Sequence, residues 1–204
     1  MNNQKNIVLC GVGGQGTVLA SKLLSAAAMS KDIPVMSAET IGMAQRGGNV
    51  TSHVRMGNNG EEVLAPLLAH GTADLVVAFE PAEAARALPF LAPGGTLVTA
   101  TTPIQPVTVA LSGKSYRVDD VLAYVREQVS SVAHSGSCGR FVAVDEGAVL
   151  DQLGNRKALN TVLLASALAT GCIPLTLEDL RSAIKACVKP KFVELNLRAI
   201  DLIG

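Results

Sequence analysis

The sequence has no tryptophan and few aromatic residues of any kind, which account for only 3% of its 204 residues. It also has no uninterrupted apolar run of the roughly 18 residues that a membrane-spanning helix requires. The apolar run that follows residues 1–5 is too short for a signal peptide. Since 49% of the residues are hydrophobic, the chain can still bury the core of one large domain over residues 1–204. We therefore expect a soluble, cytoplasmic protein with no membrane partner.

An excess of charge of either sign is also missing, because 17 basic residues balance 17 acidic ones. Proteins that bind nucleic acid over a broad surface usually carry a clear excess of basic residues. The composition therefore gives no support to a generally basic surface, and we expect no nucleic-acid partner.

Closely spaced cysteines are missing as well. A chain needs several thiolates at short spacings to hold zinc or an iron-sulfur cluster by itself. We therefore assign no metal site to this chain and interpret its cysteines as reduced thiols of a cytosolic protein. They are Cys10, Cys138, Cys172 and Cys187.

The most informative local pattern is a glycine-rich turn near the N-terminus. Four apolar residues, 7–10, precede it and a helical pattern follows, as in the strand, turn and helix that open a nucleotide-binding fold. Gly11 would supply a backbone conformation closed to other residues, Gly13 would let the backbone approach a phosphate, and Gly16 would let the helix lie close to the sheet. The alternative is that the glycines serve tight packing alone. Candidate ligand-binding residues are Gly11, Gly13, Gly14, Gln15, Gly16 and Thr17, because amides at a helix N-terminus suit an anion.

Glu39 is a further candidate, since it follows the second predicted strand, residues 35–38. A dinucleotide-binding fold places the carboxylate that binds ribose near this point. The alternative is a carboxylate that caps a helix or lies in an interface.

The segment after Glu39 contains an unusual loop and an alternating strand. Residues 40–48 are too rich in glycine for an ordinary helix, so we expect an ordered loop or a short helical turn that carries function. Residues 50–56 alternate between apolar and polar side chains, and Asn-Asn-Gly at 58–60 is typical of a hairpin turn. We therefore expect an inserted β-hairpin, with residues 61–64 as the returning strand. His53 and Arg55 would project from one side of it, and Arg46 is a candidate for the same side.

The remaining segments alternate between strands and helices. Strands are predicted over 74–79, 96–101 and 141–145, and helices over 81–91 and 119–132. Thr176 and Asp179 look like an N-cap pair within a helical C-terminal third. The sequence therefore predicts an α/β fold with a Rossmann-like, doubly wound, mostly parallel sheet that carries the inserted hairpin.

Three segments together are more specific than the glycine turn alone. They are Gly-Val-Gly-Gly-Gln-Gly at 11–16, the segment 38–55 that contains Gly-Met-Ala-Gln-Arg-Gly-Gly-Asn, and Glu-Leu-Asn-Leu-Arg-Ala-Ile at 194–200. Together they resemble the gamma-type domain of 2-oxoacid:ferredoxin oxidoreductases, and the resemblance extends over essentially the whole chain. Within that family, Lys-Pro-Lys-Phe-Val-Glu-Leu-Asn-Leu-Arg-Ala at 189–199 is most similar to the small beta subunits of the indolepyruvate enzymes.

The resemblance implies the oxidative decarboxylation of a 2-oxo acid to an acyl-CoA, with ferredoxin as electron acceptor. Such complexes use thiamine diphosphate, Mg, iron-sulfur clusters and coenzyme A. This sequence has neither a thiamine diphosphate motif nor cysteines for clusters, so the resemblance implies a larger partner subunit that carries both. The chain would be the non-thiamine-binding subunit, would hold no cofactor firmly, would contribute no assigned catalytic residue and would be inactive alone.

We expect the glycine turn and the loop Gln45-Arg46-Gly47-Gly48 to face that partner near its thiamine site. Arg46 would pair with the carboxylate of the oxo acid or with a phosphate of coenzyme A. The alternative is that Arg46 and Arg55 form interface salt bridges only. His53 is either a proton donor or a histidine held by an ordinary structural hydrogen bond.

Three other interpretations remain open at this point. The chain could be a free-standing NAD- or FAD-binding protein, with the ribose on Glu39. It could be an adenylating enzyme of the ubiquitin-activating type, although those usually have an aspartate after the second strand and zinc-binding cysteines. It could also be a purely structural interaction subunit.

Overall fold

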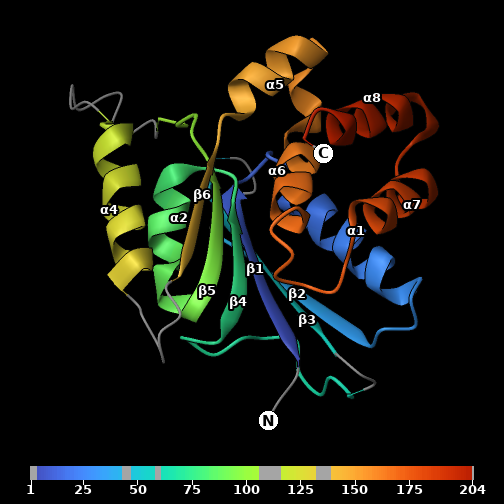
Figure 1. The fold of residues 1–204 in the computed structure, drawn as a ribbon, viewed down its shortest axis with the longest axis horizontal. Coiled ribbons are helices and arrows are strands. Elements are labelled where there is room, and N and C mark those ends of the chain that lie inside the picture. Colours follow the sequence, from blue (N-terminus) through green and yellow to red (C-terminus); the bar gives the residue numbers. More distant parts are fainter. Residues whose placement is uncertain (1–3, 43–46, 58–60, 106–115, 132–138, 204) are drawn as a thin grey trace.

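The computed structural model describes residues 4–42, 47–57, 61–105, 116–131 and 139–203. These residues form one six-stranded sheet with helices on both faces (Figure 1). The strands lie side by side in the order β2 (Val35–Ile41), β3 (Asn49–Met56), β1 (Lys5–Val12), β4 (Ala73–Ala78), β5 (Leu91–Ala100) and β6 (Arg140–Val144).

The sheet is mixed, and its larger half is parallel. β1, β4, β5 and β6 pair in parallel, whereas β3 is antiparallel to both of its neighbours, β1 and β2. Ile7, Val8 and Leu9 of β1 are completely buried, as expected for a central strand covered on both faces. The structure confirms the predicted α/β, Rossmann-like fold class with its helical C-terminal third.

Two groups of helices cover the two faces of the sheet (Figure 1). Ile7 and Leu9 belong to the larger core cluster, and Val8 and Cys10 to the smaller one, because successive strand side chains point to opposite faces. The larger cluster includes α1 (Thr17–Met29), α5 (Glu146–Leu153), α6 (Leu159–Leu168), α7 (Leu177–Cys187) and α8 (Pro190–Asp201). The smaller cluster includes α2 (Pro81–Ala87) and α4 (Val118–Ser131), and short 3-10 helices span Leu88–Phe90 and Arg156–Ala158.

The antiparallel pair exists, but its strands are β2 and β3, and the prediction that residues 61–64 form a returning strand is wrong. Residues 61–64 have no regular secondary structure, and the predicted turn at 58–60 lies outside the described residues. The physical reason is that β3 already bonds β1 along one edge and β2 along the other. The segment that follows instead crosses the face of the sheet, where the Leu68 amide donates to His53 Nδ1.

The helix starts were predicted more accurately than the strand pairing. Thr176 and Asp179 form a complete capping box at the start of α7, in which each side chain bonds the backbone N–H of the other. α8 begins at Pro190, whose missing N–H costs nothing in the first helical turn. These signals are local, so they do not depend on the rest of the fold.

Candidate functional site

The glycine turn joins the carboxyl end of β1 to the start of α1. Gly14 and Gly16 have positive φ angles of 107° and 88°, which residues with a Cβ rarely adopt. Gly16 is the N-cap of α1, and neither a side-chain cap nor an acidic residue occupies the first turn of that helix. The N–H groups of this turn therefore face a region where an anion would be stabilised.

Gly11 has a different role from the one predicted, because its φ is not in the left-handed region and it lies within β1. A Cβ at Gly11 would lie 2.9 Å from Gln15 Oε1 and 2.9 Å from Phe79 Cβ. The prediction of a special backbone conformation is thus wrong, and the requirement for glycine comes from close packing. Gln15 explains that packing, since its Oε1 accepts from the Val12 amide at 2.7 Å and its Nε2 donates to the Phe79 carbonyl at 2.7 Å. Gln15 therefore ties the turn to the end of β4.

The segment 47–48 lies against the glycine turn. The Gly13 amide donates to the Gly48 carbonyl at 2.8 Å, so this N–H is already bonded within the chain. Gly47 has a φ of 79°. The structure therefore brings Gly47 and Gly48 to the turn, whereas Gln45 and Arg46 lie outside the described residues.

A crevice of about 380 Å³ opens beside the turn, on the side of the C-terminal helices. We call it the glycine-turn crevice. It lies at the carboxyl ends of β1 and β4, where open α/β sheets bind ligands. Leu19 and Leu150 contribute apolar walls, and Gly14, Gly16, Arg156, Lys157 and Asn160 contribute polar ones.

Asn160 is a buried side chain of this crevice, with only 4% of its surface exposed. Its Oδ1 accepts from the Thr161 amide at 3.0 Å, and the structure gives its Nδ2 no acceptor among the described residues. A Cβ at Gly16 would lie 3.5 Å from that Nδ2, so the Asn160 amide group faces the start of α1. Because this Nδ2 is not among the fully buried atoms that lack a partner, it reaches the crevice that Asn160 lines, and a ligand oxygen there can accept from it.

The charges of the glycine-turn crevice also favour an anion. Arg156 and Lys157 line it, and Lys157 Nζ lies 5.3 Å from the centre of the Phe192 ring. The carboxylate in the crevice, Glu146, is 2% exposed and accepts from the Thr101 amide at 2.8 Å and the Thr102 amide at 2.9 Å. Glu146 is thus bonded to the backbone, and Arg156 lies 3.8 Å from Asp151 in an exposed ion pair. Among the described residues, no carboxylate forms an ion pair with Lys157.

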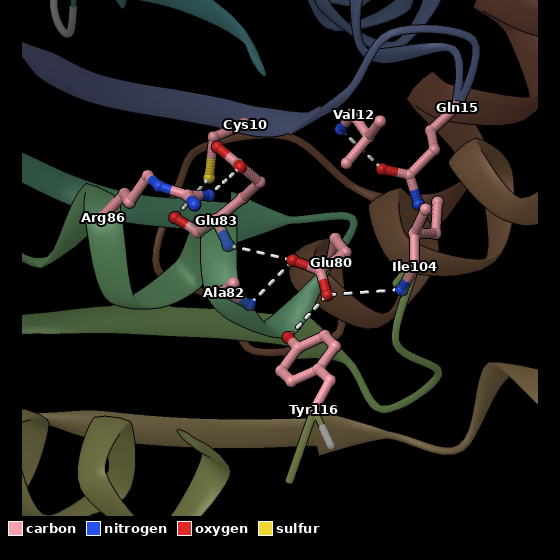
Figure 2. A network of polar contacts seen from close by, with 9 residues as sticks. All are labelled: Cys10, Val12, Gln15, Glu80, Ala82, Glu83, Arg86, Ile104 and Tyr116. Carbon is pink, nitrogen blue, oxygen red and sulfur yellow. Dashed lines mark hydrogen bonds and ion pairs between the residues drawn. The ribbon is translucent and has the colours of Figure 1, made fainter. Parts of the chain in front are cut away.

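A second crevice, of about 440 Å³, opens on the α2 side of the turn, where Figure 2 shows the polar contacts of Glu80 and Glu83. We call it the Glu83 crevice. Glu80, at the start of α2, accepts from the Ala82 and Glu83 amides at 2.7 and 3.1 Å, from Tyr116 Oη at 2.6 Å and from the Ile104 amide at 3.3 Å. Burial and the bond to Glu80 raise the pKa of the Tyr116 hydroxyl. Glu80 therefore fastens the start of α2 to Tyr116 and Ile104.

Glu83 lies next to these Glu80 contacts and is 5% exposed. Arg86 donates to its Oε1, and the Arg86 side chain is 60% exposed. Burial raises the pKa of Glu83, and the Glu80 charge acts in the same direction against the opposing charge of Arg86. Cys10 donates its thiol to the Glu83 carbonyl at 3.4 Å, and burial raises its pKa, so this cysteine stays protonated and unreactive at neutral pH.

Three other predicted site residues do not join these crevices. Glu39 lies inside β2, and β3 separates that strand from β1, so Glu39 is one strand farther from the turn than a ribose-binding carboxylate would be. His53 is buried, edge-on to the Phe90 ring at 5.3 Å, and burial lowers its pKa. Arg55 pairs with Asn6 at the opposite end of β1 from the turn, and its guanidinium bonds Gln4, Asn6 and the Ala65 carbonyl.

Sequence analysis missed several residues of the two crevices. In the sequence, Glu80 and Glu83 are typical acidic residues of a helix start at Pro81, and Asn160 is typical of a residue that caps a helix. The available signal was position, because Glu80 and Glu146 each follow a strand that ends at the same edge of the sheet as the turn. Missed residues are Glu80, Glu83, Arg86, Tyr116, Glu146, Arg156, Lys157 and Asn160.

In the part of the chain that the structure describes, no helix is both long and apolar enough to span a bilayer. The same residues include no group of three or more His, Cys, Asp or Glu side chains placed to hold a metal ion.

Curated relatives match nearly the whole chain. The indolepyruvate oxidoreductase subunit IorB of Methanothermobacter thermautotrophicus is 38% identical over 195 residues, which cover 95% of this chain and 93% of the relative. The protein of the same name from Pyrococcus horikoshii is 35% identical over 198 residues, which cover 97% of this chain and 93% of that relative. These matches confirm the resemblance to the indolepyruvate branch.

Solved structures share the fold. The pyruvate oxidoreductase subunit PORC of Thermotoga maritima superposes with a TM-score of 0.66 at 22% identity, covering 97% of this chain and 93% of that one. A 2-oxoglutarate:ferredoxin oxidoreductase of Magnetococcus marinus superposes with a TM-score of 0.67 at 17% identity. The match covers 98% of this chain and 30% of that one. A family model described as pyruvate ferredoxin/flavodoxin oxidoreductase matches residues 6–203. The chain therefore belongs to the pyruvate ferredoxin/flavodoxin oxidoreductase family.

Proposed function

We propose that the chain is the non-thiamine-binding subunit of an indolepyruvate-type 2-oxoacid ferredoxin oxidoreductase, and that its glycine-turn crevice holds the phosphates of coenzyme A. The relatives named indolepyruvate oxidoreductase subunit IorB support the first part. The Magnetococcus marinus structure, described with coenzyme A and succinyl-CoA bound, supports coenzyme A as the co-substrate to test. The complex would decarboxylate indolepyruvate oxidatively and reduce ferredoxin.

The observation that carries the proposal is the unpaired amide of Asn160. Asn160 Nδ2 is not among the fully buried side-chain atoms that lack a partner in the described part of the chain, so it opens onto the crevice, where a ligand oxygen can accept from it. The Asn160 amide group faces Gly16 and the start of α1. A phosphate oxygen placed there would accept from this amide and from the first N–H groups of α1.

The residues present fit coenzyme A in charge and shape. Lys157 and Arg156 provide positive charge at the crevice, which suits a diphosphate. Leu19 and Leu150 provide apolar wall for a part of the ligand without charge. When bound, coenzyme A supplies the thiol that accepts the acyl group. The task of this chain would be to hold and orient the phosphates, with Gly14 and Gly16 allowing the backbone to approach them.

The described residues include no group of three or more His, Cys, Asp or Glu side chains placed to hold Mg or an iron-sulfur cluster, and the sequence has no thiamine diphosphate motif. We assign those groups, and the contact with ferredoxin, to a larger partner subunit. No catalytic step is therefore assigned to a residue of this chain, and we expect the isolated chain to be inactive.

Calorimetric titration of the full chain with coenzyme A, NAD and FAD tests the crevice. We expect coenzyme A to bind, and Lys157→Ala to weaken it about tenfold, since a charge-assisted hydrogen bond contributes about 1.5 kcal/mol or more. Lys185→Ala on the exposed face of α7 is the matched control and should bind like wild type. Binding of NAD or FAD without binding of coenzyme A would instead support a free-standing dinucleotide-binding protein.

Activity provides the second test. The chain co-purified with its larger subunit should reduce ferredoxin only when indolepyruvate and coenzyme A are both present. Turnover of a 2-oxo acid by this chain alone would contradict the assignment of thiamine chemistry to the partner.

A further inference from the structure

Glu83 is a buried carboxylate whose pairing within the chain is incomplete (Figure 2). Arg86 donates to Oε1, and the structure gives Oε2 no donor among the described residues. Glu80, one turn earlier, differs from Glu83 because both of its carboxylate oxygens are hydrogen-bonded, with four donors in total. Glu83 Oε2 is not among the fully buried atoms that lack a partner in the described part of the chain, so it opens onto the space beside it, where an entering donor can reach it.

Two hollows meet at Glu83 and Arg86. The Glu83 crevice of about 440 Å³ lies on one side, and a smaller hollow of about 150 Å³, lined also by Thr51 and Phe90, lies on the other. Glu83 is thus within reach of a group that enters from outside. The Arg86 side chain is 60% exposed, so it lies at the entrance, whereas the Glu83 side chain that it bonds is only 7% exposed.

The charges around these hollows favour a cation as the occupant. Among the described residues that line them, Glu80 and Glu83 are acidic and Arg86 is the basic one. An anion would have to approach two carboxylates, whereas an ammonium or guanidinium group would form an ion pair with Glu83 and donate to its second oxygen.

The neighbouring sheet face is covered in part, because Leu68 and Phe90 lie over His53 of β3, and it is exposed along β2. α2 packs on β1, β4 and β5, whereas α1 packs on β2 and β3 from the other face. Thr40 pairs with Thr51, which pairs with Cys10, so these residues lie on the α2 face of the sheet. Met36 lies on the same face of β2 and is 39% exposed. β2 is also an edge strand, which a partner can cover.

We infer that the Glu83 crevice is part of the interface with the larger subunit, and that a lysine or arginine side chain of that subunit enters it and pairs with Glu83. This inference depends on the proposed function, because it takes the larger subunit as the occupant. Charge complementarity selects the entering group, and the exposed face of β2, where Met36 is 39% exposed, provides room for the rest of the partner.

The test measures the dissociation constant between this chain and the co-expressed larger subunit, at low and high salt. Glu83→Gln keeps the shape of the side chain and removes its charge. We expect it to raise the dissociation constant about thirtyfold or more, as loss of one member of a buried ion pair does, and to reduce its salt dependence. Glu178→Gln is the matched control, since Glu178 lies on α7 with its side chain 74% exposed, and its dissociation constant should stay within twofold of wild type.

Arg86→Gln gives an independent measurement. If Arg86 competes with the partner's cation for Glu83, removing it leaves the dissociation constant unchanged or lowers it. A rise as large as that of Glu83→Gln would mean that Arg86 contacts the partner, and would overturn the inference. Thermal unfolding of each isolated variant checks that the chain is folded.

The failure of this inference can be told apart from failure of the proposed function. A wild-type complex that assembles while Glu83→Gln assembles equally well contradicts the inference alone. Self-association of the chain that Glu83→Gln weakens, without an effect on the larger subunit, would place a second copy in the crevice and also overturn it. Absence of any complex, together with no binding of coenzyme A, contradicts the proposed function.

Discussion

Gly11→Ala is the substitution whose effect follows most directly from the structure. The new Cβ would lie 2.9 Å from Gln15 Oε1, 2.9 Å from Phe79 Cβ and 3.1 Å from Thr17 Cγ2. Cβ contacts under 3.0 Å essentially do not occur, so at least one of these neighbours must move. Both contacts must be relieved: the Gln15 side chain can rotate away, whereas Phe79 is completely buried and can shift only together with the packed core.

The cost has two parts. Overpacking of a filled core costs about 1–3 kcal/mol. Displacement of Gln15 breaks its bonds to the Val12 amide and the Phe79 carbonyl, and a net hydrogen bond is worth about 1 kcal/mol. The free energy of unfolding should therefore fall by about 3–5 kcal/mol, and since a chain of this size loses about 2–4 °C per kcal/mol, the melting temperature should fall by roughly 6–20 °C.

Thermal unfolding followed by circular dichroism measures this change. Gly147→Ala is the matched control, because a Cβ there would make ordinary contacts of 3.5 Å or more, and Gly147 has no positive φ and lies within α5. Alanine favours a helix over glycine by about 0.5–1 kcal/mol, so the control should unfold at the same temperature as wild type or slightly above it. If Gly11→Ala behaved like Gly147→Ala, the argument that Gln15 and Phe79 leave no room at residue 11 would be refuted.

Two further predictions concern pH and helix capping. Burial lowers the pKa of His53 in the folded chain, so the unfolded chain takes up the proton at a higher pH than the folded chain does. The free energy of unfolding should therefore fall as the pH drops below about 6.5. In urea titrations at pH 5 and 7.5, His53→Gln should show a smaller difference in this free energy than wild type. Partial burial opposes the shift at Asp179, but bonds from Thr176 prevail and lower its pKa, so its contribution to stability should be present above about pH 4 and be lost as the pH falls through the folded pKa. Thr176→Ala should cost about 1 kcal/mol in urea unfolding at pH 7, because the Thr176 hydroxyl accepts from the Asp179 amide and donates to the Asp179 carboxylate. The cap bond does not titrate, so much of this cost should remain at pH 2, and absence of a cost at pH 7 would contradict the capping role.

The elements that sequence analysis predicted well are those whose cause is local. The glycine turn, the start of α2 at Pro81 and the capping box of Thr176 each depend on a few consecutive residues. The pairing of β3 failed because an alternating strand suits any antiparallel neighbour, and the turn pattern at 58–60 favoured the nearest one. Only the complete sheet shows that both edges of β3 are occupied by β1 and β2.

Of the two candidate sites, sequence analysis predicted the glycine turn and missed the side chains that line the crevices beside it. Asn160 belongs to the site because it lies against Gly16, and no pattern in a single sequence connects two residues so far apart along the chain. Glu83 and Arg86 illustrate the same limit, since a spacing of three residues is typical of an exposed ion pair on a helix. The property that makes Glu83 a candidate is its burial, which depends on the packing of α2 on the sheet.

The two crevices share a framework that connects the two proposals physically. Ile104 lines both of them, and Glu80 and Glu146 fix the segment 101–104 between them by accepting from its backbone amides. Gln15 holds the glycine turn to the end of β4, immediately before Glu80. A ligand on one side of the turn and a partner on the other would therefore contact walls built on the same strand ends. For this reason Gly11→Ala should weaken both coenzyme A binding and subunit assembly, whereas Lys157→Ala should affect the first and Glu83→Gln the second.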